Sequence, residues 1–223
     1  MGSDDLFHKR KAKVAEDLSR KKAKRASYQK VLIVCEGEKT EPFYIADLVE
    51  DNRLNTANVE IDGSCGSSPK SVFERAFALW REEERKGDPY DAVYCVFDKD
   101  SYQSYEETIT KIKTQKPDEV FNATVSVPCF EYWLLLHFEY TTKPYTSTGA
   151  TSSAEEVMKD LLRFMPNYKK AEESTYTNLK SQLEFAMANA VRALNQATSS
   201  HTENPTTKVF ELVDFLLNLK GTI

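Results

Sequence analysis

The sequence predicts an α/β fold: a mostly parallel sheet flanked by helices, with a helical extension at the C-terminal end. Two continuous apolar runs of β-forming residues, 31–35 and 92–97, are typical of parallel strands buried on both faces. Helical patterns alternate with the strands, which implies right-handed crossovers within one open sheet. The chain has 223 residues, of which 40% are hydrophobic, and this is enough for one such core with additional helices.

The first three elements follow from local signals. Residues 31–35 form the first strand, and after a tight Glu-Gly turn a helix opens at Pro42. A short alternating strand is expected over 58–62. Ser68 and Pro69 then have the pattern of an N-cap and a first helical position, so a second helix begins there.

The middle of the chain continues the alternation. The second buried strand, 91–97, ends abruptly in acidic residues, and a polar helix is expected over 105–114. A further strand covers 123–127, and the aromatic-rich run 130–138 has the pattern of a largely buried helix. Ligands of such sheets bind beyond the carboxyl ends of the strands, so those ends are where a site is expected.

The C-terminal third is predicted to be helical. A loop rich in Thr, Ser, Pro and Gly covers 141–153, and helical spacing follows over 155–165 and 179–196. Asn204 and Pro205 have the pattern of an N-cap and first position of the last helix. Its expected apolar stripe consists of Val209, Leu212, Val213, Leu216 and Leu217.

Charge divides the chain into an arm and a body. Residues 1–30 hold ten basic and four acidic residues, so of the 30 Lys and Arg and 35 Asp and Glu of the whole chain, 20 and 31 remain and the rest carries a net charge of −11. Such an arm is suited to nucleic acid, but it could equally be a solvated helix or dock on the acidic body. We therefore expect a basic N-terminal arm over 1–30, an α/β core over 31–140, and a linker with helices packing on the core over 141–223.

Composition also excludes some classes of protein. No apolar run approaches the roughly 20 residues that span a bilayer, and the N-terminus carries charges where a signal peptide needs an apolar segment. We expect no membrane contact and a cytoplasmic protein. The four cysteines form no CxxC pair and are expected to be reduced, mostly buried thiols; they are Cys35, Cys65, Cys95 and Cys129.

Acidic residues follow the two most apolar strands. Glu36 with Glu38, and Asp98 with Asp100, fall at the carboxyl ends of these strands, which topology places at one edge of the sheet. Converging carboxylates repel one another unless a proton or cation separates them, and Mg²⁺ prefers such oxygen ligands. The alternative is that these acids only cap loops and helices. The pattern favours a Mg²⁺ site.

Four blocks of the sequence resemble a known family. VLIVCEGEKTEP at 31–42 and PCFEYWLLLHF at 128–138 are similar to motifs of RloB-like proteins, and NPTT at 204–207 resembles the start of their last helix. VFDKD at 96–100 resembles the Asp-x-Asp motif of the wider Toprim superfamily, and the Glu-Gly turn of the first block is similar to that of the same superfamily.

This resemblance implies a Toprim-like (Rossmann-like) fold in which Glu36 acts in acid/base or metal-mediated catalysis. Asp98 and Asp100 would bind Mg²⁺ together with Glu36, and Mn²⁺ could substitute. The family implies an RloA-type ATPase partner in bacterial phage defence. Cys35 and Lys99 depart from the commonest Toprim pattern, but neither change removes a carboxylate.

Other residues could complete the site. Glu131 either joins the metal shell or is an ordinary acid near a helix N-terminus. Within the segment 168–170, Lys169 is a candidate catalytic residue that could stabilise transition-state charge, the alternative being a solvated surface. His137 lies in an apolar run and is expected to be a hydrogen-bonded core histidine rather than a catalyst.

The leading hypothesis is a Mg²⁺-dependent nuclease that acts on DNA or RNA, tRNA included, as an effector of antiviral defence or abortive infection. The second is a nucleic-acid or protein-binding adaptor that keeps the fold without turnover. A nucleotidyl-transfer or strand-passage enzyme is disfavoured because the chain lacks the additional domains. The sequence leaves open the substrate, the activation trigger and the oligomeric state, a homo-oligomer included.

Overall fold

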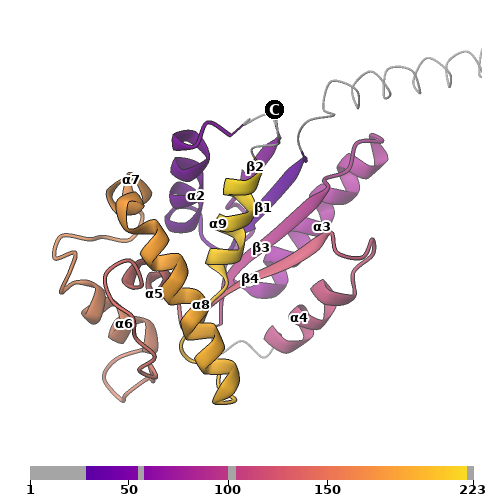
Figure 1. The fold of residues 1–223 in the computed structure, drawn as a ribbon. Helices are drawn as coiled ribbons and strands as arrows, with labels where there is room; N and C mark the ends of the chain where they lie inside the picture. Colours follow the sequence, from indigo (N-terminus) through magenta and orange to yellow (C-terminus); the bar gives the residue numbers. More distant parts are fainter. Residues whose placement is uncertain (1–28, 55–57, 100–103, 220–223) are drawn as a thin grey trace, which may run out of the picture.

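A computed structural model describes residues 29–54, 58–99 and 104–219, and it contains a five-stranded sheet (Figure 1). The strand order is β2-β1-β3-β4-β5; the first four strands are parallel, and β5 is antiparallel to β4. The predicted mostly parallel α/β fold is therefore confirmed. The strands are β1 (Val31–Cys35), β2 (Val59–Asp62), β3 (Ala92–Asp98), β4 (Phe121–Val127) and β5 (Thr206–Thr207).

The register of the central strands aligns their carboxyl ends. Cys35, the last residue of β1, pairs with Val96 of β3, and Asp98 pairs with Ser126 of β4. The residues that follow β1 and those that end β3 therefore share one edge of the sheet, as the acidic clusters predicted.

Helices cover both faces of the sheet (Figure 1). Alternate residues of β1 face opposite sides, as the pleat requires: Ile33 belongs to the core that contains Tyr44 of α2 (Thr40–Asp51), and Leu32 belongs to the core that contains Trp80 of α3 (Pro69–Arg85). The helix α4 (Tyr105–Thr114) packs on the α3 side. Both faces of β1 are thus buried, which explains its continuous apolar run.

The C-terminal helices extend the core on the α2 side. Leu212 and Leu216 of the last helix are fully buried in the cluster that includes β1 and α2, which confirms the predicted apolar stripe at these positions. The segment after β4 thus shares a core with the first half of the chain. Its helices are α5 (Glu131–Leu135), α6 (Ser153–Leu161), α7 (Thr175–Leu179), the 3₁₀ turn η1 (Lys180–Gln182), α8 (Leu183–Ser199) and α9 (Val209–Asn218).

The prediction that Asn204 caps the last helix is wrong. The helix α9 begins only at Val209, and the two residues Thr206 and Thr207 pair with the edge of β4 as strand β5. Backbone groups at that edge need partners, and β5 supplies them. The Asn204 side chain instead binds the backbone of Tyr145, accepting from its N–H at 3.1 Å and donating to its carbonyl at 2.6 Å.

Other boundaries differ from the expectation in smaller ways. The strand β4 begins at Phe121, two residues early, and only Glu131–Leu135 of the run 130–138 is α-helix. The predicted cap of α3 is confirmed, since the Ser68 hydroxyl accepts from the Ser71 N–H at 3.2 Å. All four cysteines are free, and Cys65 alone among them is partly exposed.

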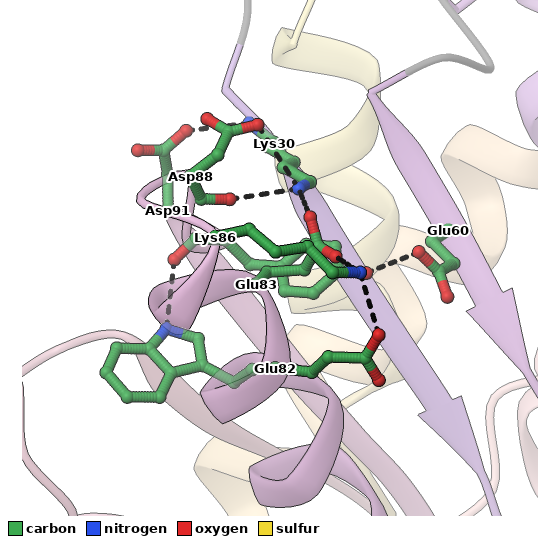
Figure 2. A network of polar contacts seen from close by, with 9 residues as sticks. Lys30, Glu60, Glu82, Glu83, Lys86, Asp88 and Asp91 are labelled. Carbon is green, nitrogen blue, oxygen red and sulfur yellow. Dashed lines mark hydrogen bonds and ion pairs between the residues drawn. The ribbon is translucent and has the colours of Figure 1, made fainter. Parts of the chain in front are cut away.

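A polar network closes the amino end of the sheet (Figure 2). Lys30 precedes β1 and contacts Glu83 through its ammonium group, which also donates to the Asp88 carbonyl at 2.9 Å. Its backbone N–H donates to Asp91 at 2.7 Å. Residues 1–28 of the basic arm lie outside the described residues, so the structure describes the point where the arm meets the body, at the edge opposite the acidic residues.

No described helix, in 29–54, 58–99 or 104–219, combines the length and apolar character needed to cross a bilayer.

Candidate active site

Glu36 and Asp98 meet at the carboxyl edge of the sheet. Because β1 and β3 are neighbours, the Glu36 N–H continues their ladder and donates to the Val96 carbonyl at 2.9 Å. The Glu36 carboxylate then turns toward β3 and accepts a hydrogen bond from the Asp98 N–H at 3.0 Å. The two predicted site residues are thus joined directly, and both are only half-buried.

Asp98 is surrounded by other carboxylate side chains. Burial raises the pKa of its carboxyl group well above the usual range, and the negative charges of Glu41, Glu131 and Glu36 raise it further. A hydrogen bond from the Phe130 backbone works in the opposite direction. Four carboxylates, from the turn after β1 and from α2, β3 and α5, therefore act on one another here.

Glu131 is the most deeply buried of the four. It opens α5, just after β4, and is only 2% exposed. Its Oε1 atom lies 3.0 Å from the Nζ atom of Lys170, which reaches it from the loop after α6. A carboxylate buried to this degree needs a partner, and Lys170 supplies the positive charge.

Glu41 is the site residue that the sequence analysis missed. It lies in the first turn of α2, where burial raises the pKa of its carboxyl group, Glu131 and Glu36 raise it further, and Lys170 opposes the shift. The sequence did contain a signal for Glu41. It lies in the same motif as Glu36, five residues later, at the start of the helix that follows the turn.

The Glu-Gly turn is held by close backbone packing. A Cβ atom placed on Gly63, just after β2, would lie 2.6 Å from the Gly37 carbonyl oxygen and 3.0 Å from the Glu38 Cα atom. Such distances are far inside van der Waals contact, so only glycine allows the β2 loop to brace the turn that presents Glu36.

A loop from the C-terminal part of the chain packs against this edge. The Ala171 N–H donates to the Thr40 hydroxyl at 3.0 Å, and Lys170 binds Glu131. The neighbouring Lys169, the predicted catalytic lysine, is exposed. The structure therefore brings Lys170, rather than Lys169, to the acidic residues.

A depression of about 500 Å³ opens at the same edge, lined by Lys99, Pro128 and Glu203 among others. Lys99 directly follows Asp98 and forms an ion pair with Glu203. Space for a ligand thus adjoins the strand end that carries Asp98.

The model of RloB-like proteins matches residues 31–216. This chain belongs to the RloB-like family. No curated protein and no solved structure matches it. The family match runs from β1 into α9 and so includes Glu36, Glu41, Asp98, Glu131 and Lys170, while the basic arm lies outside it.

The sequence analysis made predictions for two further residues of this RloB-like protein, Asp100 and His137. Asp100, the expected second aspartate of the metal site, lies outside the described residues. His137 is 1% exposed, and its ring nitrogens contact the Trp133 carbonyl at 3.0 Å and the Tyr44 hydroxyl at 3.4 Å. Burial lowers its pKa to about 4. It is a neutral core residue, as the apolar run around it indicated.

The donor set at the edge suits a hard divalent cation in chemical type. Over 29–54, 58–99 and 104–219, no three His, Cys, Asp or Glu side chains are spaced as a ready metal shell. Mg²⁺, however, commonly binds through one or two carboxylates and keeps water in its remaining positions. Glu36 and Asp98 of the RloB-like protein supply two adjoining carboxylates, so the residues fit such a site.

Proposed function

We propose that this RloB-like protein is a nuclease that cleaves phosphodiester bonds of DNA or RNA with Mg²⁺, for which Mn²⁺ can substitute. The observation that carries the proposal is the Glu36–Asp98 pair at the carboxyl edge, surrounded by the further carboxylates of Glu41 and Glu131. Like charges brought this close favour a bound cation or proton. The depression at this edge, lined by Lys99 directly after Asp98, offers room for a ligand.

The chain's own residues have distinct roles in this proposal. Asp98 and Glu36 would hold the cation, with Asp100 as a third ligand, and the cation would supply Lewis-acid stabilisation of phosphate charge. Glu36 also accepts the proton of the attacking water. Lys170, 3.0 Å from Glu131, brings positive charge to where the phosphate would lie. Lys169 stays a candidate for a second phosphate contact from its exposed position.

The basic arm supplies affinity for nucleic acid in this proposal. Outside residues 1–30 the chain carries a net charge of −11 from 20 basic and 31 acidic residues, which repels a phosphate backbone. Ten basic residues in the arm would offset that repulsion by neutralising phosphates.

The resemblance to RloB-like proteins of phage defence supports the biological setting. We place the protein in the cytoplasm as an antiviral effector that works with an RloA-type ATPase, which restrains or activates it.

The test is incubation of the full chain with labelled pools of DNA, RNA and tRNA, with Mg²⁺, Mn²⁺ or a chelator, and with and without the ATPase. Metal-dependent fragments are expected. Glu36→Gln should abolish them, while Glu38→Gln, the same charge change at an exposed position two residues on, should not.

Two results would contradict the proposal. Cleavage that persists in Glu36→Gln would point to a contaminating nuclease. Binding of the pools without any cleavage, in every metal and with the ATPase present, would favour the adaptor instead.

A further inference from the structure

The outer edge of the sheet, beside β4, is only partly covered. The Lys99 N–H, just after β3, donates to the Ser126 carbonyl at 2.8 Å, so the even-numbered residues of β4 turn their backbone groups toward β3. Successive backbone groups of a strand alternate in direction, so the odd-numbered residues face outward. The Lys208 N–H confirms this, because it donates to the Val125 carbonyl at 2.8 Å from the other side.

The short strand β5 covers only the carboxyl half of this edge. It pairs with Ser126 and Val127, and the chain turns into α9 directly after Lys208. The N–H and carbonyl groups of Ala123 therefore point outward, with no hydrogen-bond partner among the residues that the structure describes. Ala123 is partly exposed. Unpaired backbone groups at an edge of this kind are a template for another strand.

A depression of about 270 Å³ lies along the same edge, between α4 and α8. The strand β4 is on the outer side of the sheet next to α4 (Figure 1). Ala123 lines the depression, together with Ile109 of α4 and Leu194 of α8. Val191, one turn before Leu194, is 43% exposed and extends this apolar wall. Unpaired backbone and apolar surface thus coincide where a further strand would lie.

Backbone chemistry and charge decide which occupant fits. Another extended backbone satisfies such an edge, because it brings donors and acceptors at the same spacing. Lys113 and Lys208 line the depression; Lys208 lies 3.9 Å from Glu211, and Lys113 has no ion pair with a described residue. The acidic lining residue, Glu203, is already paired with Lys99. Acidic side chains on the occupant would therefore be favoured.

Two occupants from this chain itself fit poorly. The basic arm has the wrong sign, with ten basic and four acidic residues in 1–30. A second copy would bring its own β4, whose seven residues would run into β5 on the same side of the edge.

We propose that the open edge of β4 at Ala123 binds an extended, acidic segment of another protein, which joins the sheet as a further strand. The depression shares Val127 and Glu203 with the one at the acidic edge, so the segment would lie next to the candidate active site. This docking needs no nuclease activity.

The test measures binding of labelled peptides to the full chain by fluorescence anisotropy. The peptides are about six residues long, a usual strand length, and alternate Val with Glu, Gln or Lys. The Glu peptide should bind most tightly and the Lys peptide least. Two versions of the Glu peptide carry N-methyl groups on alternate amides. Only one set of amides faces β4, because a slip of one residue turns Val to the other face. One version should therefore bind at least roughly tenfold more weakly, and the other should bind normally.

Variants of the protein give the matching result. Ala123→Pro removes an N–H that points away from β3, so the protein should fold and bind the Glu peptide roughly 3- to 10-fold more weakly. Lys113→Glu should weaken the Glu peptide and strengthen the Lys peptide. The control is Lys111→Glu, the same charge change on α4 at an exposed residue that does not line the depression, which should leave both affinities unchanged.

Three results would overturn the inference. The wild type could bind no Glu peptide, both N-methylated versions could bind equally well, or Lys113→Glu could bind like Lys111→Glu. If Ala123→Pro fails to fold, the N-methylated pair and Lys113→Glu still decide. Binding of single-stranded DNA that Lys113→Glu weakens, with no binding of any peptide, would assign the depression to nucleic acid instead. Because no arm measures cleavage, a protein that binds the peptides as expected but cuts nothing would contradict only the nuclease.

Discussion

The Glu36 carboxylate accepts a hydrogen bond from the Asp98 N–H at 3.0 Å, so one proposed site residue positions the backbone of the other. The contact crosses from the end of β1 to the end of β3, which pair in parallel. It gives the Glu36 carboxylate a defined orientation at the sheet edge. Substitutions at these two residues should therefore separate metal binding from proton transfer.

Asp98→Asn exchanges a charged oxygen for a neutral amide oxygen, so Mg²⁺ should bind at least roughly tenfold more weakly, and excess metal should partly restore cleavage. Glu36→Gln should behave differently, since an amide cannot accept the proton at any metal concentration. Its cleavage rate should stay about 100- to 10,000-fold low with saturating metal. Calorimetry with Mg²⁺ and cleavage of the best substrate check both.

Both variants should remain folded. The amide oxygen of Glu36→Gln can still accept from the Asp98 N–H, and each change removes one charge from a repelling group. Without metal, melting temperatures should equal or exceed that of the wild type. Wild-type protein that binds no divalent ion would refute the metal site, whatever the variants do.

Gly63→Ala should disturb the turn that presents Glu36. The new Cβ atom would meet the Gly37 carbonyl at 2.6 Å, and backbone cannot move aside cheaply. We expect a loss of about 1–3 kcal/mol in the free energy of unfolding, typical of overpacking, with reduced cleavage. The control is Gly149→Ala, whose new Cβ atom would meet no described residue within 4 Å beyond its two chain neighbours. Equal effects at both glycines in urea unfolding would show that the close approach is relieved in solution.

The fold and half of the site could be predicted because they depend on local patterns. Continuous apolar runs identify β1 and β3, and parallel topology alone brings Glu36 to Asp98. Asn204 shows the limit of this reasoning: an Asn-Pro pair before an apolar stripe has the same appearance whether it caps a helix or precedes a short strand. Whether the residues after Asn204 form a strand depends on the open edge of β4, which lies far away in the sequence.

The positions of Tyr168 and Lys170 could not be predicted from local patterns either, because contacts with residues distant in the sequence determine them. They reach the acidic edge because a loop of the C-terminal part contacts α2, and the hydrogen bond that ties it joins residues 131 positions apart. Three consecutive polar residues at 168–170 gave no sign of which would point inward. Only the packing places Tyr168 in the core, Lys170 on Glu131 and Lys169 in solvent.

Leu212→Ala should test how much α9 contributes to folding. Leu212 is fully buried, so truncation should cost about 2–5 kcal/mol in urea unfolding. Val191→Ala, on α8 and 43% exposed, should change stability by about 0.5 kcal/mol or less. A Leu212→Ala loss near zero would mean that α9 is not packed in solution, and a similar loss at both sites would indicate a partner covering α8.

His137 should make the free energy of unfolding fall as the pH is lowered below about 6.5. Its pKa is about 4 in the fold against 6.5 as its ordinary value, so the unfolded chain takes up a proton first as pH falls. The contribution is complete above pH 6.5 and is lost as pH falls toward 4, by about 3 kcal/mol in all. His137→Asn keeps a donor for the Trp133 carbonyl but cannot titrate. Its urea-derived stability should fall less steeply across this window, and an unchanged slope would show that His137 is not responsible.

Lys30, the last residue of the arm, should contribute to the stability of the fold rather than to nucleic-acid binding. Its ammonium group, with the side chain 14% exposed, is held by Glu83 and by the Asp88 carbonyl (Figure 2). Lys30→Met removes both contacts, although Glu83 keeps its ion pair with Lys86, and should lower the free energy of unfolding by about 1–3 kcal/mol. The hydrogen bond from Lys30 also lowers the pKa of Glu83, so the variant should raise it.

Deletion of residues 1–29 should affect nucleic-acid binding and not stability, the reverse of Lys30→Met. The deletion keeps Lys30 and removes the other nine of the arm's ten basic residues. The melting temperature should stay nearly unchanged, while nucleic-acid affinity should fall and depend less steeply on salt, by roughly 0.7–0.9 in the log–log slope for each phosphate that is no longer neutralised. Lys30→Met, which removes a charge already paired within the body, should keep most of the wild-type slope. Melting curves and binding titrations between low and high salt distinguish the two. If the truncated protein unfolds, the arm is part of the fold, and nucleic-acid binding must be sought on the body itself.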